Sequence, residues 1–231
     1  MNKIQKNIYL LAVATTFSLP VLASSIDVHV VGTITPSACV PALSDGGVVD
    51  YGVIRADSLN TDDYTKLPEK QLDFTITCKE RTQIAITAIN GRPNTLAGAT
   101  ENGYHHAGKL PVNMSAGSEG VGLGLDGDSK IGGYAVRAVN YTAKADGENV
   151  QNIQRRGSNN WDSSNASLYT ISTSVPLYSA WSATIYPHVV ASFRYLSFKL
   201  GVQAYINKTS ELDLSKPITL DGLTTIELVY L

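Results

Sequence analysis

Two cysteines are the residues in this sequence whose chemistry can be assigned most directly. Cys39 and Cys78 are the only cysteines in the chain, and neither lies in a CxxC spacing or next to a histidine. An isolated pair of this kind is typical of a structural disulfide in an oxidising compartment. The alternative is a metal site, but two thiols without further ligands are too few to hold zinc. We therefore expect Cys39 and Cys78 to be bonded to each other.

The histidines and the paired aspartates do not add up to a metal centre. The adjacent pair His105-His106 lies in a Gly-rich stretch with no carboxylate or thiol at ligand spacing, so we interpret it as loop surface. The segment Asp126-Gly127-Asp128 resembles half of a calcium loop. It lacks the downstream bidentate glutamate and carries Lys130 where a ligand should be. The sequence therefore predicts a tight hairpin between the strands that contain Gly122 and Ile131, with no metal and no cofactor.

Catalytic motifs are absent from the sequence. It contains no G-x-S-x-G elbow, no HExxH helix motif and no Gly-rich phosphate loop. Basic residues form no cluster beyond Arg155-Arg156, so the footprint that a phosphate backbone requires is missing. We expect neither an enzyme nor a nucleic-acid-binding protein.

The N-terminal residues predict export. Lys3 and Lys6 precede an almost wholly apolar run from Ile8 to Leu22, and a small residue, Ala23, follows. A membrane anchor is the alternative, but about fifteen apolar residues are fewer than the roughly 20 needed to span a bilayer. We expect residues 1–23 to be a cleaved signal peptide. The mature chain, 24–231, would then be one domain in the periplasm, or in a fimbrium or at the cell surface, without a membrane span.

The rest of the chain shows the two-residue period of β-strands that bury one face. Apolar and polar residues alternate in 26–34, 72–78, 84–88, 196–206 and 218–230. The dipeptide Asn90-Gly91 is a strong turn signal after the third of these segments. Further strands are expected at 48–54, 121–125, 131–140 and 168–173. Because no convincing amphipathic helix is found, the sequence predicts an all-β fold.

Two stretches in the middle, 92–120 and 142–165, have little periodicity and predict long surface loops. Aromatic residues gather in and after the second stretch: Trp161, Tyr169, Tyr178, Trp181, Tyr186 and Tyr195. We expect these rings to fill the core beneath a loop. The alternative is a periplasmic carbohydrate-binding module, in which the rings would share an exposed face and stack on sugars.

Several of these segments together resemble the subunits of chaperone-usher fimbriae. The residues that carry the resemblance are Gly32-x-Ile34 before Cys39, Val49-Asp50-Tyr51-Gly52, Phe74-x-Ile76-x-Cys78, Gly122-Leu123-Gly124-Leu125 with Lys130-Ile131-Gly132, and Leu220-Asp221-Gly222 running to Leu228-Val229-Tyr230. Within that group the chain is similar to an enterobacterial family of fimbria-like periplasmic proteins of unknown function, which includes the periplasmic protein of the glutamate synthase operon. The resemblance spans the mature chain.

The resemblance implies a fold, a disulfide position and partners. The fold would be an immunoglobulin-like, pilin-type β-sandwich in which Cys39–Cys78 ties the first strand to the end of the second. A periplasmic chaperone would add a strand to the edge that carries Ile226, Leu228 and Tyr230, and an usher and fellow fimbrial subunits would be further partners in building a pilus for cell adhesion. The alternative is that these three residues are plain core residues.

The N-terminal segment departs from the pattern of polymerising pilins. Those subunits donate a strand that precedes the first-strand glycine, whereas here only Ser24 to Val31 precede Gly32, a strand of about 26 Å at most. Its three anchors are Ile26, Val28 and Val30. We therefore expect a minor or non-polymerising structural subunit, without catalysis, in which these anchors pair within their own molecule.

Overall fold

The computed structural model describes residues 38–231. The predicted signal peptide and the anchors Ile26, Val28 and Val30 lie outside the described residues. Within 38–231 the fold is all-β, as predicted, and no α-helix is present. No helix in this range is long and apolar enough to cross a membrane.

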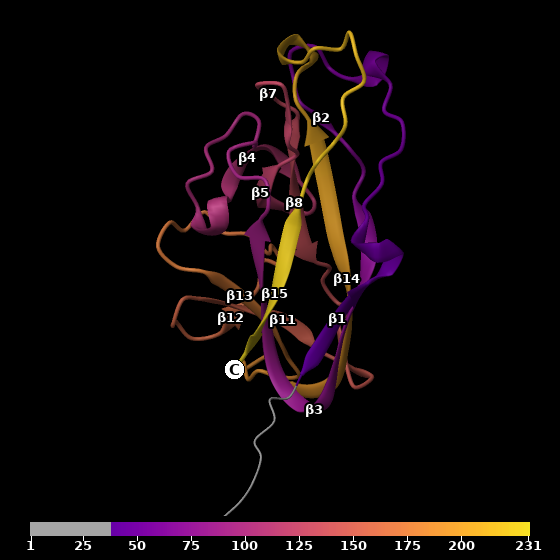
Figure 1. Cartoon of the computed structure of the whole chain (residues 1–231). Coiled ribbons are helices and arrows are strands. Elements are labelled where there is room, and N and C mark those ends of the chain that lie inside the picture. The colour runs from indigo at the N-terminus through magenta and orange to yellow at the C-terminus, as the bar shows by residue number, and fades with distance from the viewer. Residues whose placement is uncertain (1–37) are drawn as a thin grey trace, which may run out of the picture. The chain divides into compact units, whose positions relative to one another are not determined.

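A single long strand, β3 (Lys70–Asn90), organises the fold. Its first half alternates buried and exposed residues, whereas residues 84–88 are buried on both faces. Between the halves lies the polar stretch Lys79-Glu80-Arg81, which is exposed and coincides with the bend of β3 at the lower end of Figure 1. The sequence thus predicted two strands where the structure has one bent strand.

The two halves of β3 pair with different neighbours. The first half lies between β1 (Cys39–Leu43) and β14 (Ser192–Ile206). The second half lies between β15 (Thr224–Tyr230) and β13 (Leu177–Ser182). All these ladders are antiparallel, so β3 joins two parts of one curled sheet.

Further strands extend each part. Beyond β14 lie β8 (Gly132–Ala138), β5 (Gly117–Gly122) and β4 (Gly108–Met114), with short pairings by β2 (Thr65–Lys66), β9 (Lys144–Ala145) and β10 (Glu148–Asn149). Beyond β13 lie β11 (Gln151–Arg156) and β12 (Asp162–Ser163). A separate hairpin is formed by β6 (Leu125–Asp126) and β7 (Ser129–Lys130). Short 3-10 segments occupy Ser44–Gly47, Ala56–Ser58, Tyr104–His106 and Thr209–Glu211.

The core lies between the two parts of the sheet. The even-numbered residues of β14 from Leu196 to Ile206 are all buried, as their alternation predicted. The ring of Phe198 contacts Phe74 of β3 and Trp181 of β13, with centroids 4.8 Å apart in each pair. Trp181 therefore closes the core from the β13 side.

Several predicted strand boundaries were wrong. Residues 48–54 and 168–173 are not strands, and of 218–230 only Thr224–Tyr230 forms one. Conversely, the two stretches predicted as loops contain β4, β5 and β9 to β12. In β5 the alternation of apolar and polar residues is hidden by glycines, which are needed because neighbouring backbone lies too close for a side chain. A Cβ at Gly120 would lie 2.2 Å from the carbonyl oxygen of Tyr134. Close approach of two backbones, not burial of apolar side chains, shapes that strand.

Candidate functional site

Two strands of the sheet, β1 and β15, are joined at one end. Cys39 and Cys78 form a disulfide, as predicted, and face each other in the β1–β3 register. The backbone N–H of Cys39 donates a hydrogen bond to the hydroxyl of Tyr230, with an N···O distance of 2.8 Å. Both strands lie beside β3 in Figure 1, one along each half. In residues 38–231, β3 is the only strand with which either of them forms a ladder, so each keeps one open edge.

An apolar groove lies between these open edges. It encloses about 750 Å³. One wall is formed by 41–43 and 46–49, and the other by alternate residues from Leu220 to Ile226. Core side chains of β3, β8 and β14 form the floor, among them Phe74, Val136 and Val202. The groove therefore opens directly onto the hydrophobic core.

A second hollow continues the groove along the same two segments. It encloses about 590 Å³ and shares Val48, Val49, Tyr51 and Leu220 with the first. Its rim carries apolar side chains that water reaches freely: Val48 is 63% exposed and Val53 is 96% exposed. Exposed apolar residues lining one continuous hollow are typical of an interaction surface.

The C-terminal residues that the sequence singled out form part of this wall. Ile226 and Leu228 are partly buried and pack against the core, and Ile226 lines the groove. Tyr230 is 50% exposed and reaches across to Cys39. The stripe they belong to faces the core, as expected, but its members remain half-exposed because nothing in 38–231 covers them. In β14 the equivalent stripe is fully buried.

Thr224, the first residue of β15, anchors this wall of the groove to the core. Its hydroxyl oxygen lies 2.7 Å from the hydroxyl of Tyr134 and 2.8 Å from that of Tyr169. Burial raises the pKa of Tyr134 to about 12 and raises that of Tyr169 well above its ordinary value. Both phenols therefore stay protonated at neutral pH and can share the hydroxyl of Thr224.

Ion pairs and polar contacts fix the remaining walls. Just before β15, Asp221 makes a two-pronged contact with Arg92, at 2.7 and 2.8 Å, and this guanidinium lowers the pKa of the Asp221 carboxyl. On the opposite wall the Tyr51 hydroxyl donates to the carbonyl of Val202 and accepts from the N–H of Ala204. The groove wall at Tyr51 is therefore held by a side chain, without a backbone ladder.

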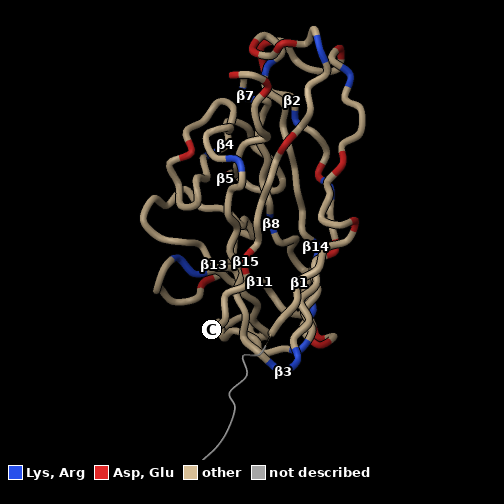
Figure 2. Tube along the Cα trace, viewed as in Figure 1, with Lys and Arg blue, Asp and Glu red and all other residues tan. Residues whose placement is uncertain are grey.

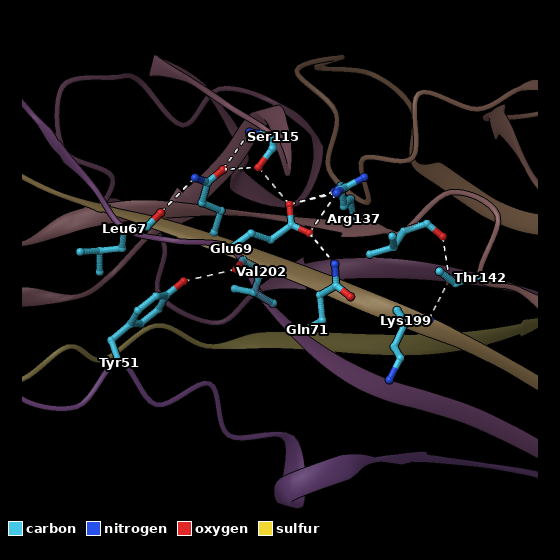
Figure 3. Close-up of polar contacts among 11 residues, drawn as sticks. Tyr51, Leu67, Glu69, Gln71, Ser115, Arg137, Thr142, Lys199 and Val202 are labelled. Carbon is cyan, nitrogen blue, oxygen red and sulfur yellow. Dashed lines mark hydrogen bonds and ion pairs between the residues drawn. The ribbon is translucent and has the colours of Figure 1, made fainter.

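A polar network holds the strands that form the floor. Figure 3 shows the carboxylate of Glu69 among Arg137, Gln71 and Ser115, each of which donates to it. The Arg137–Glu69 pair is 2.9 Å long and largely shielded from water. Because Arg137 lies on β8 and Glu69 directly precedes β3, the pair ties the two sides of β14 together.

Charge is sparse along the groove. Figure 2 shows acidic and basic residues mainly in the loops at the upper end and around the bend of β3. Strand β1 carries no charged residue, and β15 carries one, Glu227. This charge pattern suits an apolar, backbone-directed partner better than a charged ligand.

The other predicted polar candidates lie elsewhere. The hairpin expected between the Gly122 and Ile131 strands is present as β6 and β7, and the Asp126 carboxylate accepts a hydrogen bond from the Lys216 ammonium at 2.9 Å. His105 and His106 lie in a 3-10 segment, and burial lowers the pKa of His105. Among residues 38–231 no group of three or more metal-ligating side chains occurs.

The aromatic residues divide between the core and the surface. Trp181 and Tyr169 are buried, as expected for rings that fill the core. Tyr186 is 87% exposed, and Tyr195 is also exposed. Trp161 and Tyr178 are half-buried on the outer face of β11 and β13. The expectation of core rings therefore holds for some of these residues only.

These features define a disulfide-bonded all-β protein with an apolar groove that nothing in residues 38–231 covers. Residues 28–135 match the family described as "Protein of unknown function (DUF1120)". The chain is 30% identical over 216 residues to the uncharacterized protein YhcF of Escherichia coli K12, covering 90% of each chain. It is 25% identical over 242 residues to protein GltF of the same organism, covering 96% of this chain and 94% of GltF. The chain belongs to the DUF1120 family.

Sequence reasoning marked one wall of the groove clearly and the other only in part. The alternation in 218–230 pointed to the β15 side. Residues 41–49 contain Pro41, Gly46 and Gly47 and show no strand period, so no comparable signal marked them. Val48, Val49 and Tyr51 fall within the strand expected at 48–54, which the structure does not form, and nothing in the sequence identified them as a groove wall.

Proposed function

We propose that this chain is an exported, fimbria-like structural protein, and that its groove is the place where an added β-strand completes the sheet. The observation that carries this proposal is the apolar groove between two open strand edges, with core side chains as its floor. Open edges pair with further strands, and an uncovered core favours one that brings apolar side chains. No catalytic role is part of the proposal.

The strand arrangement supports a finer description of the fold. The order β1, first half of β3, β14, β8 resembles one layer of an immunoglobulin-like sandwich of the pilin type. The order β15, second half of β3, β13 resembles the other layer, and residues 38–231 place no strand on the open side of β15. The groove lies where that strand would run, which is what the resemblance to chaperone-usher subunits implies.

The chemistry of the groove specifies what kind of strand it accepts. Backbone groups on the open edge of β15 would supply hydrogen bonds, and alternate apolar side chains of the incoming strand would fill the hollow. Ile226 and Leu228, with Tyr230 at the closed end, would set the register. A periplasmic chaperone is the first partner proposed for this edge, with an usher and other fimbrial subunits as further partners in a pilus.

The chain's own N-terminal segment is the resident strand that we propose. The first hollow is walled by Leu220 to Ile226, seven residues that span about 23 Å when extended. Ser24 to Val31 would span about 26 Å, with Ile26, Val28 and Val30 at alternate positions. This match supports the segment as an occupant of the groove, and its small number of anchors favours a self-contained, non-polymerising protein over a subunit that donates the segment to a neighbour.

Deletion of Ser24–Val31 from the mature protein tests the proposal. We expect a monomer by size-exclusion chromatography before and after deletion, with a lower free energy of unfolding after it. A synthetic peptide of residues 24–34 should restore stability, and a control peptide with Asp at 26, 28 and 30 should not. Heat- and detergent-resistant ladders that vanish on deletion would instead identify a polymerising subunit. Unchanged stability together with no peptide binding would refute a strand-accepting groove.

A further inference from the structure

A second surface feature, separate from the groove, crosses three strands on the outer face of the sheet. Arg155 of β11 is the register partner of Tyr178 in β13. Its guanidinium carbon lies 5.3 Å from the ring centroid of Tyr178 and 4.7 Å from that of Trp161, which directly precedes β12. The three side chains form a row in which the cation lies between two aromatic rings.

Arg155 lacks an acidic partner in the described part of the chain. Arg55, Arg81, Arg92, Arg137 and Arg194 each contact a carboxylate, whereas Arg155 and Arg156 do not. The Nε atom of Arg155 is shielded from water and has no hydrogen-bond partner. A half-buried guanidinium with an unpaired N–H is costly unless something pairs with it.

The rings leave a specific part of the guanidinium available. Cation–π contacts engage the flat faces of the group, so its remaining hydrogen-bonding capacity lies in its plane. A planar carboxylate matches this in-plane pair of donors. The two rings pack against the buried apolar residues Ala85, Ile153 and Ala180. An ion pair between Arg155 and a carboxylate would therefore form beside an apolar surface, where Coulomb attraction is stronger than in water.

The adjacent row of the same face offers a second unpaired polar atom. Ser163 is the register partner of Ile153, and its hydroxyl lies 3.3 Å from Nε2 of His188. The Nδ1 atom of His188 is shielded and has no partner. Neighbouring rows on one face are roughly 6–7 Å apart, a spacing that suits a carboxylate and a hydroxyl of one sugar unit.

We propose that Arg155, Trp161 and Tyr178 form a binding site for the carboxylate of an acidic, uronic-acid-type saccharide. Arg155 would bind the carboxylate in its plane, and the two half-exposed rings would contact the C–H face of the sugar. The exposed hydroxyl of Ser163, which His188 contacts, would hydrogen-bond a ring hydroxyl.

Titration of the full mature protein with tri-galacturonate, and with a glucuronate-containing hyaluronan tetrasaccharide, tests this site by calorimetry and NMR. We expect at least one acid to bind and its methyl ester to lose binding. Arg155→Gln should weaken binding roughly ten- to hundredfold, as for loss of a charge-assisted pair. Arg156→Gln is the matched control, because this exposed neighbour points to the opposite face, and its effect should stay within about twofold.

Several results would overturn the proposal. The first three are no binding of either acid, equal binding of acid and ester, and equal weakening by Arg155→Gln and Arg156→Gln. Competition by acetate as effective as by the oligosaccharide would reduce the site to a small-anion site and refute the saccharide. If Arg155→Gln lowers the melting temperature markedly, Trp161→Leu takes its place, and unchanged affinity in that variant would also refute the site.

Discussion

Thr224→Val tests how the β15 wall of the groove is anchored. Valine keeps the shape of threonine but removes the hydroxyl that lies 2.7 Å from Tyr134 and 2.8 Å from Tyr169. Both tyrosines are buried, at 6% and 2% exposure, so their hydroxyls depend largely on Thr224 for a partner. Leaving a buried hydroxyl unpaired costs about 1–3 kcal/mol. With two hydroxyls affected and some relaxation, we expect unfolding free energy to fall by about 2–4 kcal/mol.

Urea unfolding followed by circular dichroism and tryptophan fluorescence measures this loss, with an unchanged m-value showing that the folded state keeps its compactness. Thr225→Val is the matched control, because the neighbouring residue is exposed and its change should stay within about 0.5 kcal/mol. Adding Tyr134→Phe to Thr224→Val should recover part of the loss, since the unpaired hydroxyl is then gone. A Thr224→Val protein within 0.5 kcal/mol of wild type would refute the anchoring role.

Three further outcomes are expected. Replacing Cys39 and Cys78 by serine should cost about 4 kcal/mol in the chain-entropy model for their separation of 39 residues, measured by urea unfolding; a loss below 1 kcal/mol would contradict it. Glu69→Gln should lower the free energy of unfolding by about 2–3 kcal/mol, because it leaves the shielded Arg137 without its charge partner. An unchanged thermal unfolding midpoint would show that the pair does not contribute to stability. The raised pKa of Tyr134 adds stability that is complete below pH 10 and lost as the pH rises through about 12, so urea midpoints should fall over that window, and less so in Tyr134→Phe.

Where every inward position is apolar, the sequence predicted the structure closely. The stripe from Leu196 to Ile206 is one face of a single long strand, and each member is buried because neighbouring strands flank β14 on both sides. The disulfide was also predictable, because two lone cysteines without further metal-ligating neighbours leave few alternatives. These inferences depend on local pattern alone, which is why they held.

Features set by distant contacts were not predictable. Alternation was found separately in 72–78 and 84–88, and nothing local indicates that hydrogen bonding continues around the bend between them. The wall at Tyr51 is held by a hydroxyl bonded to β14, a contact 151 residues apart in the chain. The row at Arg155 likewise depends on a register with Tyr178 that periodicity cannot give.

The position of the disulfide has a mechanical consequence. Cys39 is the first residue of β1, and its sulfur is bonded to Cys78 near the bend of β3. Tension applied to the chain upstream of Cys39 would therefore pass through a covalent bond into the central strand. The hydrogen bonds between β1 and β3 would carry almost none of that load. Reduction would reroute the force into that short ladder, which could then open one bond at a time.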